Sequence, residues 1–273
     1  MSAYFMTHPL HTTTLDGLRI AYRVAGHGPD VLLIHGWVSS SRMWSLLMDD
    51  LSTRFRCWAI DLPGFADSEK PGASWYSIEN YEQVINGFAD QFELGRFDLI
   101  GHSMGGMIAL RFAARQPTRV RRLVAINPVV TGRVYWDLRL LTETPLRHSM
   151  LALGRWFWPI ASSDLLRRHK SLHARRMSIE WNQATPDSAI SAAKAISHHD
   201  LTPLLPCITA PTLVIVGKRD LTAPNAEGRF AAQMIPDARL EELSAGHLPT
   251  DDVPGQTHAL VSEFLGKEEA VLV

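Results

Sequence analysis

Continuous runs of apolar residues recur along the chain, at intervals that leave room for a helix between them. Such a run is typical of a strand buried on both faces of a parallel sheet, because a strand buried on one face alternates apolar and polar positions. We therefore predict buried strands at VLLIH (31–35), CWAID (57–61), FDLIGH (97–102), RLVAIN (122–127) and TLVIVG (212–217), and a further strand over 238–243.

The segments between these strands have the apolar spacing of amphipathic helices. They cover about residues 40–52, 77–94 and 104–116, and a last helix over about 254–266 follows the final strand. Strand alternating with helix predicts right-handed crossover connections and a doubly wound sheet with helices on both faces. Near the N-terminus, LDGLRIAYRV alternates around an Asp-Gly turn, which predicts an antiparallel hairpin or edge strand.

One region departs from this rhythm. Residues 129–200 contain no buried-strand signal and are dominated by helical patterns such as WDLRLLTETPLRHSMLALGRWF. We expect a helical cap here, inserted into an α/β core made of residues 1–128 and 201–273. The expected cap has ten basic and six acidic side chains, a net charge of +4, whereas the rest has 17 and 22, a net charge of −5.

Composition places the chain among ordinary globular proteins. Its 273 residues are 46% hydrophobic and 20% charged, and a net charge of −1 gives no electrostatic reason to expect a nucleic-acid or membrane partner. The stretch MSAYFMTHPLHTTT lacks the features of a signal peptide, and no run approaches the ~18 apolar residues of a membrane span, so we expect a cytoplasmic protein. Cys57 and Cys207 lack the spacing of metal ligands, and we expect both thiols to be buried.

The clearest chemical signal is Gly101-His102-Ser103-Met104-Gly105, which fits G-x-S-x-G between a predicted strand and a predicted helix. In that context the serine is a candidate nucleophile on a sharp, strained turn. Residues two before and two after it must be small, because the backbones approach closely there, and Gly101 and Gly105 meet this requirement. An ordinary strand-to-helix turn that contains a serine is the alternative interpretation.

A serine hydroxyl needs a base to act as a nucleophile, and the base needs an acid to orient it. In this architecture the three residues follow the order serine, acid, histidine. His247 lies in the loop LSAGHLPTDD, after the predicted strand 238–243, where its side chain can reach over the sheet edge. His258 lies in the middle of the last predicted helix, and we expect it on the helix surface. We predict His247 as the base.

The best candidate for the orienting acid is Asp220, which lies just beyond the predicted strand 212–217. Catalytic groups collect at the carboxyl ends of such strands. Alternatively, Asp220 caps a helix that starts near Pro224, although Thr222 or Ala223 would be the more natural cap. Asp251 and Asp252 are poorer candidates, because they have the position of helix-start charges.

The oxyanion of an acyl-transfer intermediate needs two backbone N–H donors. We predict Met104, the residue after the nucleophile, as one donor. The other is Trp37, in the turn HGWVSSSRMW that follows the first central strand. A helix N-cap at Ser39 or Ser40 is the simpler interpretation of that turn, and it is compatible with the oxyanion role.

Taken in order, the motifs HGWVSSSRMW, DLPGFADSEKP, GHSMGG, PTLVIVGKRD and GHLP resemble the α/β-hydrolase superfamily, in its single-cap, esterase- and haloperoxidase-like branch. The resemblance covers about residues 15–266. It implies a mostly parallel eight-stranded sheet, a helical cap over the active site, and no cofactor or metal. It also implies a catalytic triad and an oxyanion hole, which here would be Ser103, Asp220 and His247 with Trp37 and Met104.

This sequence departs from the family pattern in places that narrow the activity. Ala66 replaces the second glycine of the usual D-x-P-G-x-G-x-S, which affects a turn beside the cap. Dehalogenases and epoxide hydrolases of this fold carry Asp where Ser103 stands. Carbon–carbon bond hydrolases typically have Asn before the serine and Trp after the histidine, and here these are His102 and Leu248. These activities are therefore disfavoured.

Three other features have an ordinary structural interpretation beside a functional one. The His-His-Asp run at 198–200 has no third metal ligand at helical spacing, so a structural role is favoured. The basic stretch 165–176 could contact an acidic partner or a membrane surface, but it is more typical of a solvated helix face. Six aromatic residues of the expected cap line an apolar pocket or pack the cap on the core: Tyr135, Trp136, Trp156, Phe157, Trp158 and Trp181.

The sequence thus predicts a cofactor-independent serine hydrolase that cleaves a small apolar carboxylic ester through an acyl-enzyme. Thioesters, lactones and some amides would pass through the same site, so the mechanism is better defined than the bond. The alternative from another class is a ligand-sensing receptor, because some members of the superfamily keep the triad and turn over slowly. Turnover distinguishes the two.

Overall fold

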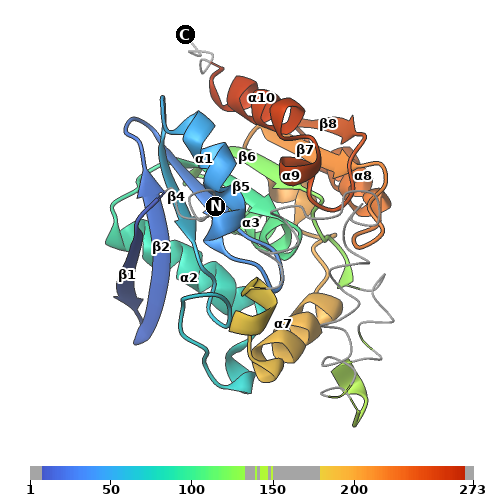
Figure 1. Cartoon of the computed structure of the whole chain (residues 1–273). Coiled ribbons are helices and arrows are strands. Elements are labelled where there is room, and N and C mark those ends of the chain that lie inside the picture. Colours follow the sequence, from blue (N-terminus) through green and yellow to red (C-terminus); the bar gives the residue numbers. More distant parts are fainter. Residues whose placement is uncertain (1–7, 133–138, 140–141, 147–148, 150–178, 268–273) are drawn as a thin grey trace.

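The computed structural model describes residues 8–132, 139, 142–146, 149 and 179–267, and an eight-stranded sheet runs through this part of the chain (Figure 1). β2 pairs antiparallel with β1 and with β4, and all pairs from β4 to β8 are parallel. The strand order is β1-β2-β4-β3-β5-β6-β7-β8. The strands are β1 (Leu10–Leu15), β2 (Leu18–Ala25), β3 (Asp30–Ile34), β4 (Arg56–Ile60), β5 (Phe97–His102), β6 (Val120–Ile126), β7 (Thr212–Gly217) and β8 (Ala238–Leu243). The predicted mostly parallel sheet and its N-terminal hairpin are confirmed.

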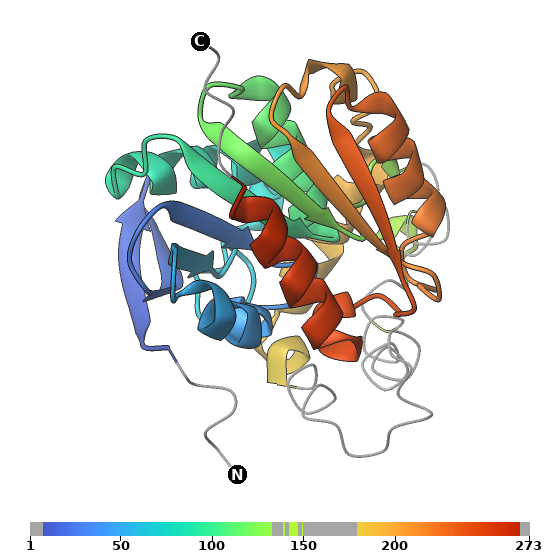
Figure 2. The ribbon, with the colours of Figure 1, turned by 90° about the horizontal axis from the view of Figure 1, so that it is seen from above.

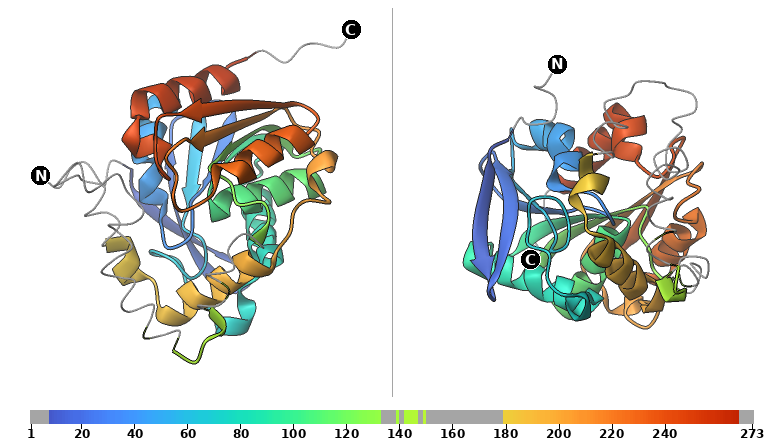
Figure 3. Two further views of the ribbon diagram at one scale, coloured as in Figure 1. Left: turned by 90° about the vertical axis from the view of Figure 1, so that its right-hand side faces the viewer. Right: turned by 60° about the horizontal axis from the view of Figure 1, so that its bottom comes forward.

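Helices cover both faces of the sheet, as the continuous apolar runs predict. In β3, Val31 and Leu33 pack with α1 (Ser45–Leu51) and α10 (Pro254–Leu265) on one face. Leu32 and Ile34 pack on the other face, with α2 (Ile78–Gln91) and α3 (Met104–Arg115). Figures 2 and 3 show the sheet between these two helical layers. The sheet is therefore doubly wound, and all four predicted helices are present.

The sheet has its topological switch point between β3 and β5. The chain leaves β3 toward the face that carries α1 and leaves β5 toward the face that carries α3. The loops at the carboxyl ends of these strands therefore diverge, and ligands of doubly wound proteins bind in the crevice that this divergence creates. The remaining elements are η2 (Ser41–Trp44), η3 (Ala73–Trp75), α7 (Pro186–His198), η6 (Leu205–Cys207), α8 (Asn225–Met234) and α9 (Pro249–Asp252).

The segment between β6 and β7 leaves and rejoins the core at one place. Thr131 forms an antiparallel bridge with Asp200, and the Gly132 N–H donates to the His199 carbonyl at 2.7 Å. Here α7 begins with Thr185 and Ser188 in a reciprocal capping box, with Pro186 in the first helical turn. The division into core (1–128 and 201–273) and cap (129–200) stays a prediction. The basic stretch 165–176 and five of the aromatic residues lie outside the described residues: Tyr135, Trp136, Trp156, Phe157 and Trp158.

Two expectations about single residues are wrong. Cys57 is buried, but Cys207 is exposed, because Leu205 and Ile208 occupy the inward positions around η6. His258 is not on the helix surface: it is 7% exposed, and its Nδ1 lies 2.6 Å from Asp50 Oδ2 between α10 and α1. Among the described helices, none combines the length and apolar character required to cross a lipid bilayer.

Candidate active site

Ser103 connects β5 directly to α3 in a strained conformation. Its φ of 54° and ψ of −116° lie outside the regions that ordinary residues occupy, which costs about 1–3 kcal/mol. Glycines make this turn possible: a Cβ at Gly101 would lie 2.2 Å from the Gly105 carbonyl oxygen, and one at Gly105 would lie 2.3 Å from that of Ile34. The sharp turn expected of a nucleophile elbow is therefore present, and Ser103 is 8% exposed.

The loop after β3 lies against this turn. A Cβ at Gly36 would be 2.9 Å from His102 Nδ1 and 3.2 Å from Ser103 Cβ, so only glycine lets the loop approach so closely. His35 fixes the start of the loop: its Nδ1 donates to the Gly36 carbonyl at 2.7 Å, and its Nε2 accepts from the Leu62 N–H at 2.9 Å. Burial lowers the pKa of His35, which keeps its ring neutral in this arrangement.

The structure brings Asp220 and His247 together, as the sequence predicts. Asp220 follows β7, His247 follows β8, and His247 Nδ1 lies 2.7 Å from Asp220 Oδ2. Because a carboxylate only accepts, Nδ1 carries the proton, and Nε2 of the neutral ring is left as the basic nitrogen. The Asp220 side chain is fully buried and that of His247 is 10% exposed.

Asp220 also stabilises its own turn, although it is not the helix cap of the alternative interpretation. Its Oδ1 accepts the N–H groups of Thr222 and Ala223 at 2.7 and 2.9 Å, while Oδ2 contacts His247. The helix cap itself falls at Pro224. The two backbone hydrogen bonds fix the carboxylate plane, so Oδ2 is oriented toward His247 independently of the imidazole.

The Ser103 hydroxyl forms no hydrogen bond with any group in the described part of the chain. The step of the relay from His247 to Ser103 therefore stays a prediction, and so do the oxyanion roles of Trp37 and Met104. In serine hydrolases this hydrogen bond is often long without substrate and tightens in the reacting complex. Met104 begins α3, and Trp37 follows the Gly36 contact with the elbow.

Asn127 is a residue of this site that sequence reasoning missed. It follows β6, is 2% exposed and has a left-handed φ of 41°. Its Nδ2 donates to the carbonyls of His247 and Gly246 at 2.9 and 3.2 Å, and its Oδ1 accepts the Gly217 N–H at 2.7 Å. Asn127 thus ties the end of β7, which leads to Asp220, to the loop that carries His247. The available signal was its place as the polar last residue of the predicted strand 122–127.

Two further side chains hold the histidine loop. His102 Nε2 donates to the His247 carbonyl at 2.7 Å, and the two rings lie 4.7 Å apart. Asp252 accepts the Gly246 N–H at 2.7 Å. The sequence treated Asp252 and Asp251 as weaker candidates for the triad acid, and the structure gives Asp252 a different role, because it fixes the backbone beside His247.

Ala66, which replaces a glycine of the family pattern, has a left-handed backbone. Its φ is 44°, in the left-handed region, and it is 4% exposed. Alanine pays about 1–2 kcal/mol for this conformation, which glycine would not. The departure from the family pattern therefore costs stability and leaves the turn in place.

Residues of the segment between β6 and β7 contact the loop at residues 37–40. The Trp37 indole donates to the Ala189 carbonyl at 2.9 Å, and its ring packs edge-on against Trp181 at 5.6 Å. Glu180, 2% exposed, accepts hydrogen bonds from Ser40 Oγ at 2.5 Å and Ser39 Oγ at 3.3 Å. The serines thus satisfy a buried carboxylate, and Ser40 also caps η2.

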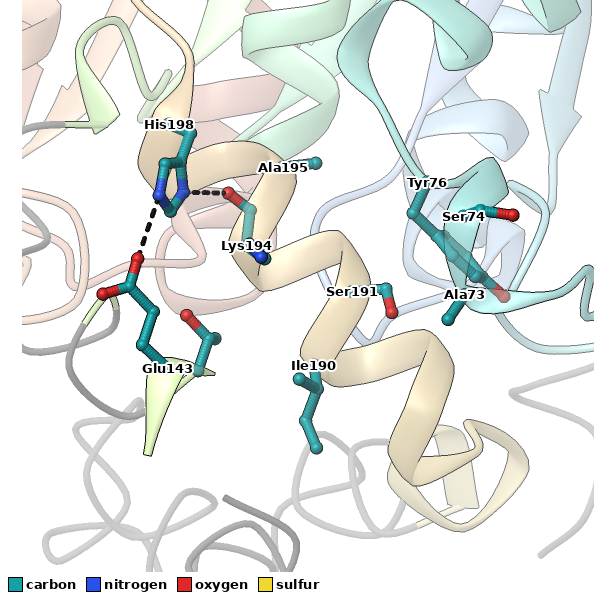
Figure 4. Close-up of a pocket in the computed structure, with 10 residues that line it drawn as sticks. Ala73, Ser74, Tyr76, Glu143, Ile190, Ser191, Lys194, Ala195 and His198 are labelled. Carbon is teal, nitrogen blue, oxygen red and sulfur yellow. Dashed lines mark hydrogen bonds and ion pairs between the residues drawn. The ribbon is translucent and has the colours of Figure 1, made fainter. Parts of the chain in front are cut away.

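A cavity of about 620 Å³ lies between α7, η3 and residues 142–143 (Figure 4). Neither Ser103 nor His247 lines it. The residues of the His-His-Asp run have separate partners: His198 contacts Glu143, His199 lies 3.7 Å from Glu79, and Asp200 accepts the Thr202 N–H. Within the described ranges no cluster of three or more potential ligands could hold a metal ion.

A doubly wound sheet, a strained serine at the end of β5 and a histidine–aspartate pair after β8 and β7 are the features of an α/β hydrolase. The family model for the α/β-hydrolase fold matches residues 29–252, and the chain belongs to this family. The predicted resemblance is therefore confirmed.

Three relatives show the range of the family around this chain. It is 28% identical to the pimeloyl-[acyl-carrier protein] methyl ester esterase of Nitrosomonas europaea, over 87% of this chain and 96% of the relative. It is 30% identical to haloalkane dehalogenase 2 of Mycobacterium tuberculosis, over 91% and 92%. The crystal structure of the enol-lactonase from Burkholderia xenovorans matches with a TM-score of 0.82 and 28% identity, over 94% of this chain and 100% of that one. Together these comparisons support hydrolase activity.

Proposed function

We propose that this protein is a serine hydrolase that cleaves carboxylic esters through an acyl-enzyme on Ser103, His247 and Asp220. The observation that carries the proposal is the 2.7 Å hydrogen bond from His247 Nδ1 to Asp220 Oδ2, at the same sheet edge as the strained Ser103. This bond leaves Nε2 as the free base, which is the nitrogen that must accept the serine proton.

In the proposed cycle, Ser103 Oγ attacks the ester carbonyl while His247 Nε2 takes its proton. The N–H groups of Trp37 and Met104 stabilise the oxyanion, and Asp220 stabilises the imidazolium. The alcohol leaves with the proton from His247, and water then hydrolyses the acyl-enzyme with His247 again as base. Loss of one oxyanion donor costs about 3 kcal/mol of transition-state stabilisation in a site of this kind.

The names of the relatives support this bond type. A methyl ester esterase and an enol-lactonase both open an acyl–oxygen bond, one in an open chain and one in a ring. The dehalogenase relative does not alter the proposal, because Ser103 stands where the dehalogenases of this fold carry aspartate. The substrate we propose is a small molecule, a carboxylic ester, with lactones as its internal form.

We also propose that residues 129–200 form a cap over this site. Its two ends meet at the Thr131–Asp200 bridge. Contacts from Ala189 and Glu180 to the loop at residues 37–40 support this arrangement, because they link the segment to the proposed oxyanion donor. In this arrangement the cap restricts which esters reach the serine.

Chromogenic p-nitrophenyl esters of increasing acyl length test the proposal with the wild type, Ser103→Ala and Asp220→Asn. We expect many turnovers per site in the wild type, loss of activity in Ser103→Ala, and a large fall in kcat for Asp220→Asn, since the wrong histidine tautomer would then be favoured. Equal hydrolysis by wild type and Ser103→Ala would exclude the mechanism. Arrest after one turnover would favour the ligand-sensing receptor instead.

A further inference from the structure

Val38, which directly follows the proposed oxyanion donor Trp37, has a strained backbone. Its φ is 49°, in the left-handed region, and the residue is buried in the core. A β-branched side chain makes this conformation an outlier, and such strain persists only where the surrounding structure enforces it. The other non-glycine residues with left-handed φ in the described part of the chain are not β-branched: Asp16, Ala66, Glu93, Ser103 and Asn127.

The core of the protein fixes the loop that contains Val38 at both ends. Before Val38, Gly36 packs against the nucleophile elbow and leaves no room there for a side chain. After it, the Ser41 N–H donates to the buried Asp61 Oδ1 at 2.6 Å. Because both ends are tied, a change of φ at Val38 has to be compensated by rotation of the neighbouring peptides, including the one that carries the Trp37 N–H.

Residues of the segment between β6 and β7 contact the loop on both sides of Val38. The Trp37 indole, immediately before it, donates to the Ala189 carbonyl at 2.9 Å. The hydroxyls of the two serines immediately after it donate to the carboxylate of the buried Glu180 at 3.3 and 2.5 Å. These hydrogen bonds flank the strained residue directly, so they supply a constraint of the kind that its backbone requires.

We propose that Val38 is a positioning residue, whose left-handed backbone directs the Trp37 N–H toward the oxyanion. The hydrogen bonds to Glu180 and Ala189 hold Val38 in this conformation. When they are lost, the loop relaxes, the strain at Val38 is released and the Trp37 N–H turns away from the oxyanion. Glu180 and Ala189 thereby act on the chemical step through the backbone of the loop. This inference rests on the proposed ester hydrolysis.

The test combines Glu180→Ala with two substitutions at Val38 and measures the hydrolysis of p-nitrophenyl butyrate. Val38→Ala and Val38→Gly both remove the γ-methyl groups, but only glycine adopts the left-handed region without strain, so Val38→Ala is the matched control. We expect Glu180→Ala to lower kcat about tenfold in the wild type and in Val38→Ala, but less than about threefold in Val38→Gly, at unchanged KM. Equal losses of kcat in all three backgrounds would overturn the inference.

Trp37→Phe is a second way to weaken the contacts with the loop, and it leaves Glu180 in place. It removes the hydrogen bond to the Ala189 carbonyl and keeps an aromatic ring against Trp181. We expect Trp37→Phe to lower kcat more in the wild type and in Val38→Ala than in Val38→Gly, because glycine retains access to the left-handed conformation when the constraint is weakened. A loss of kcat that does not depend on the residue at position 38 would contradict the proposal.

Urea unfolding separates this inference from the proposed function, because it does not depend on activity. With Glu180 present, Val38→Gly should unfold at a higher urea concentration than Val38→Ala, since glycine relieves the strain. In Glu180→Ala the relaxed loop no longer strains position 38, so the glycine variant should unfold at the same or a lower urea concentration than the alanine variant. The same difference in both backgrounds would overturn the inference, even if the ester is hydrolysed. If the differences are as expected but the wild type hydrolyses no ester, the proposed function fails and the strained loop held by Glu180 is supported.

Discussion

Asn127 gives the sharpest test of how the fold positions the proposed base. In Asn127→Ala three hydrogen bonds are lost, to Gly246, His247 and Gly217. At a net value of about 1 kcal/mol each, the loss is about 3 kcal/mol of stability. Alanine also tolerates the φ of 41° less well than asparagine, which adds about 1 kcal/mol. For a chain of this size we expect the Tm to fall by about 8–16 °C.

The same variant should lose activity while it is still folded. With Asn127 removed, the backbone of His247 keeps its bond from His102 but loses the link to the end of β7, so the imidazole and Asp220 no longer share a support. Since a displacement of about 1 Å can cost 100-fold in rate, we expect kcat for a p-nitrophenyl ester to fall about 10- to 100-fold. KM should change little, because the lost bonds do not line the substrate site.

Two controls keep the experiment decisive. Asn127→Gly removes the same hydrogen bonds but relieves the left-handed backbone, so the difference between the glycine and alanine variants measures the strain alone. Asn86→Ala removes an asparagine that bonds Asp90 and Arg119 at the surface, and it should change stability by less than about 1 kcal/mol. The reasoning is refuted if Asn127→Ala keeps the wild-type kcat and melts within two or so degrees of the wild type.

Three further predictions concern other parts of the molecule. In steady-state assays Glu180→Ala should lower kcat about tenfold at constant KM, because it releases the loop that carries the proposed oxyanion donor. Gln183→Ala, three residues further along, serves as the control and should have little effect on kcat. Equal losses of kcat in the two variants would argue against this role of Glu180. A maleimide should label one thiol in the native protein, at Cys207, because burial raises the pKa of Cys57 to about 12, and mass spectrometry of the labelled protein checks the site. Burial raises the pKa of Glu227, so the folded state holds this proton more tightly than the unfolded chain and loses stability as the pH rises above 4.5. In urea unfolding, the free energy of unfolding of Glu227→Gln should therefore rise relative to that of the wild type from acidic to neutral pH. A difference in unfolding free energy that does not change with pH would contradict the argument.

The sheet could be predicted from sequence because its strands are buried on both faces. A continuous apolar run such as VLLIH indicates a strand that is buried on both faces. In the observed β3, Val31 and Leu33 pack against one helical layer, and Leu32 and Ile34 pack against the other. The turn around Ser103 could be predicted for a similar reason, since a close backbone approach excludes every side chain larger than hydrogen at Gly101 and Gly105. Both signals are local in the chain.

The groups that support the site could not be predicted, because their partners are far away along the chain. The bond between His102 and His247 spans 145 residues, and the bond between Asn127 and Gly217 spans 90. The helix position of His258 predicts a surface residue, but its ring is buried beside Asp50, which lies 208 residues earlier in the chain. A polar residue at the end of a buried strand can be located at the sheet edge from sequence, but the loop to which it forms hydrogen bonds cannot be predicted.

The proposed ester hydrolysis needs two properties, and the described structure separates them. The groups proposed for the chemistry follow β5, β7 and β8, and a shared sheet edge fixes them through backbone bonds that do not depend on the substrate. The face of α7 lies outside that sheet, and its side chains at 190, 194 and 198 can change without disturbing a strand. Substitutions on α7 should therefore alter which ester is preferred, whereas substitutions at the sheet edge should alter the rate for every ester. The series of p-nitrophenyl esters of increasing acyl length measures both effects, because a change in the preferred length reports on α7 and a common fall in kcat reports on the sheet edge.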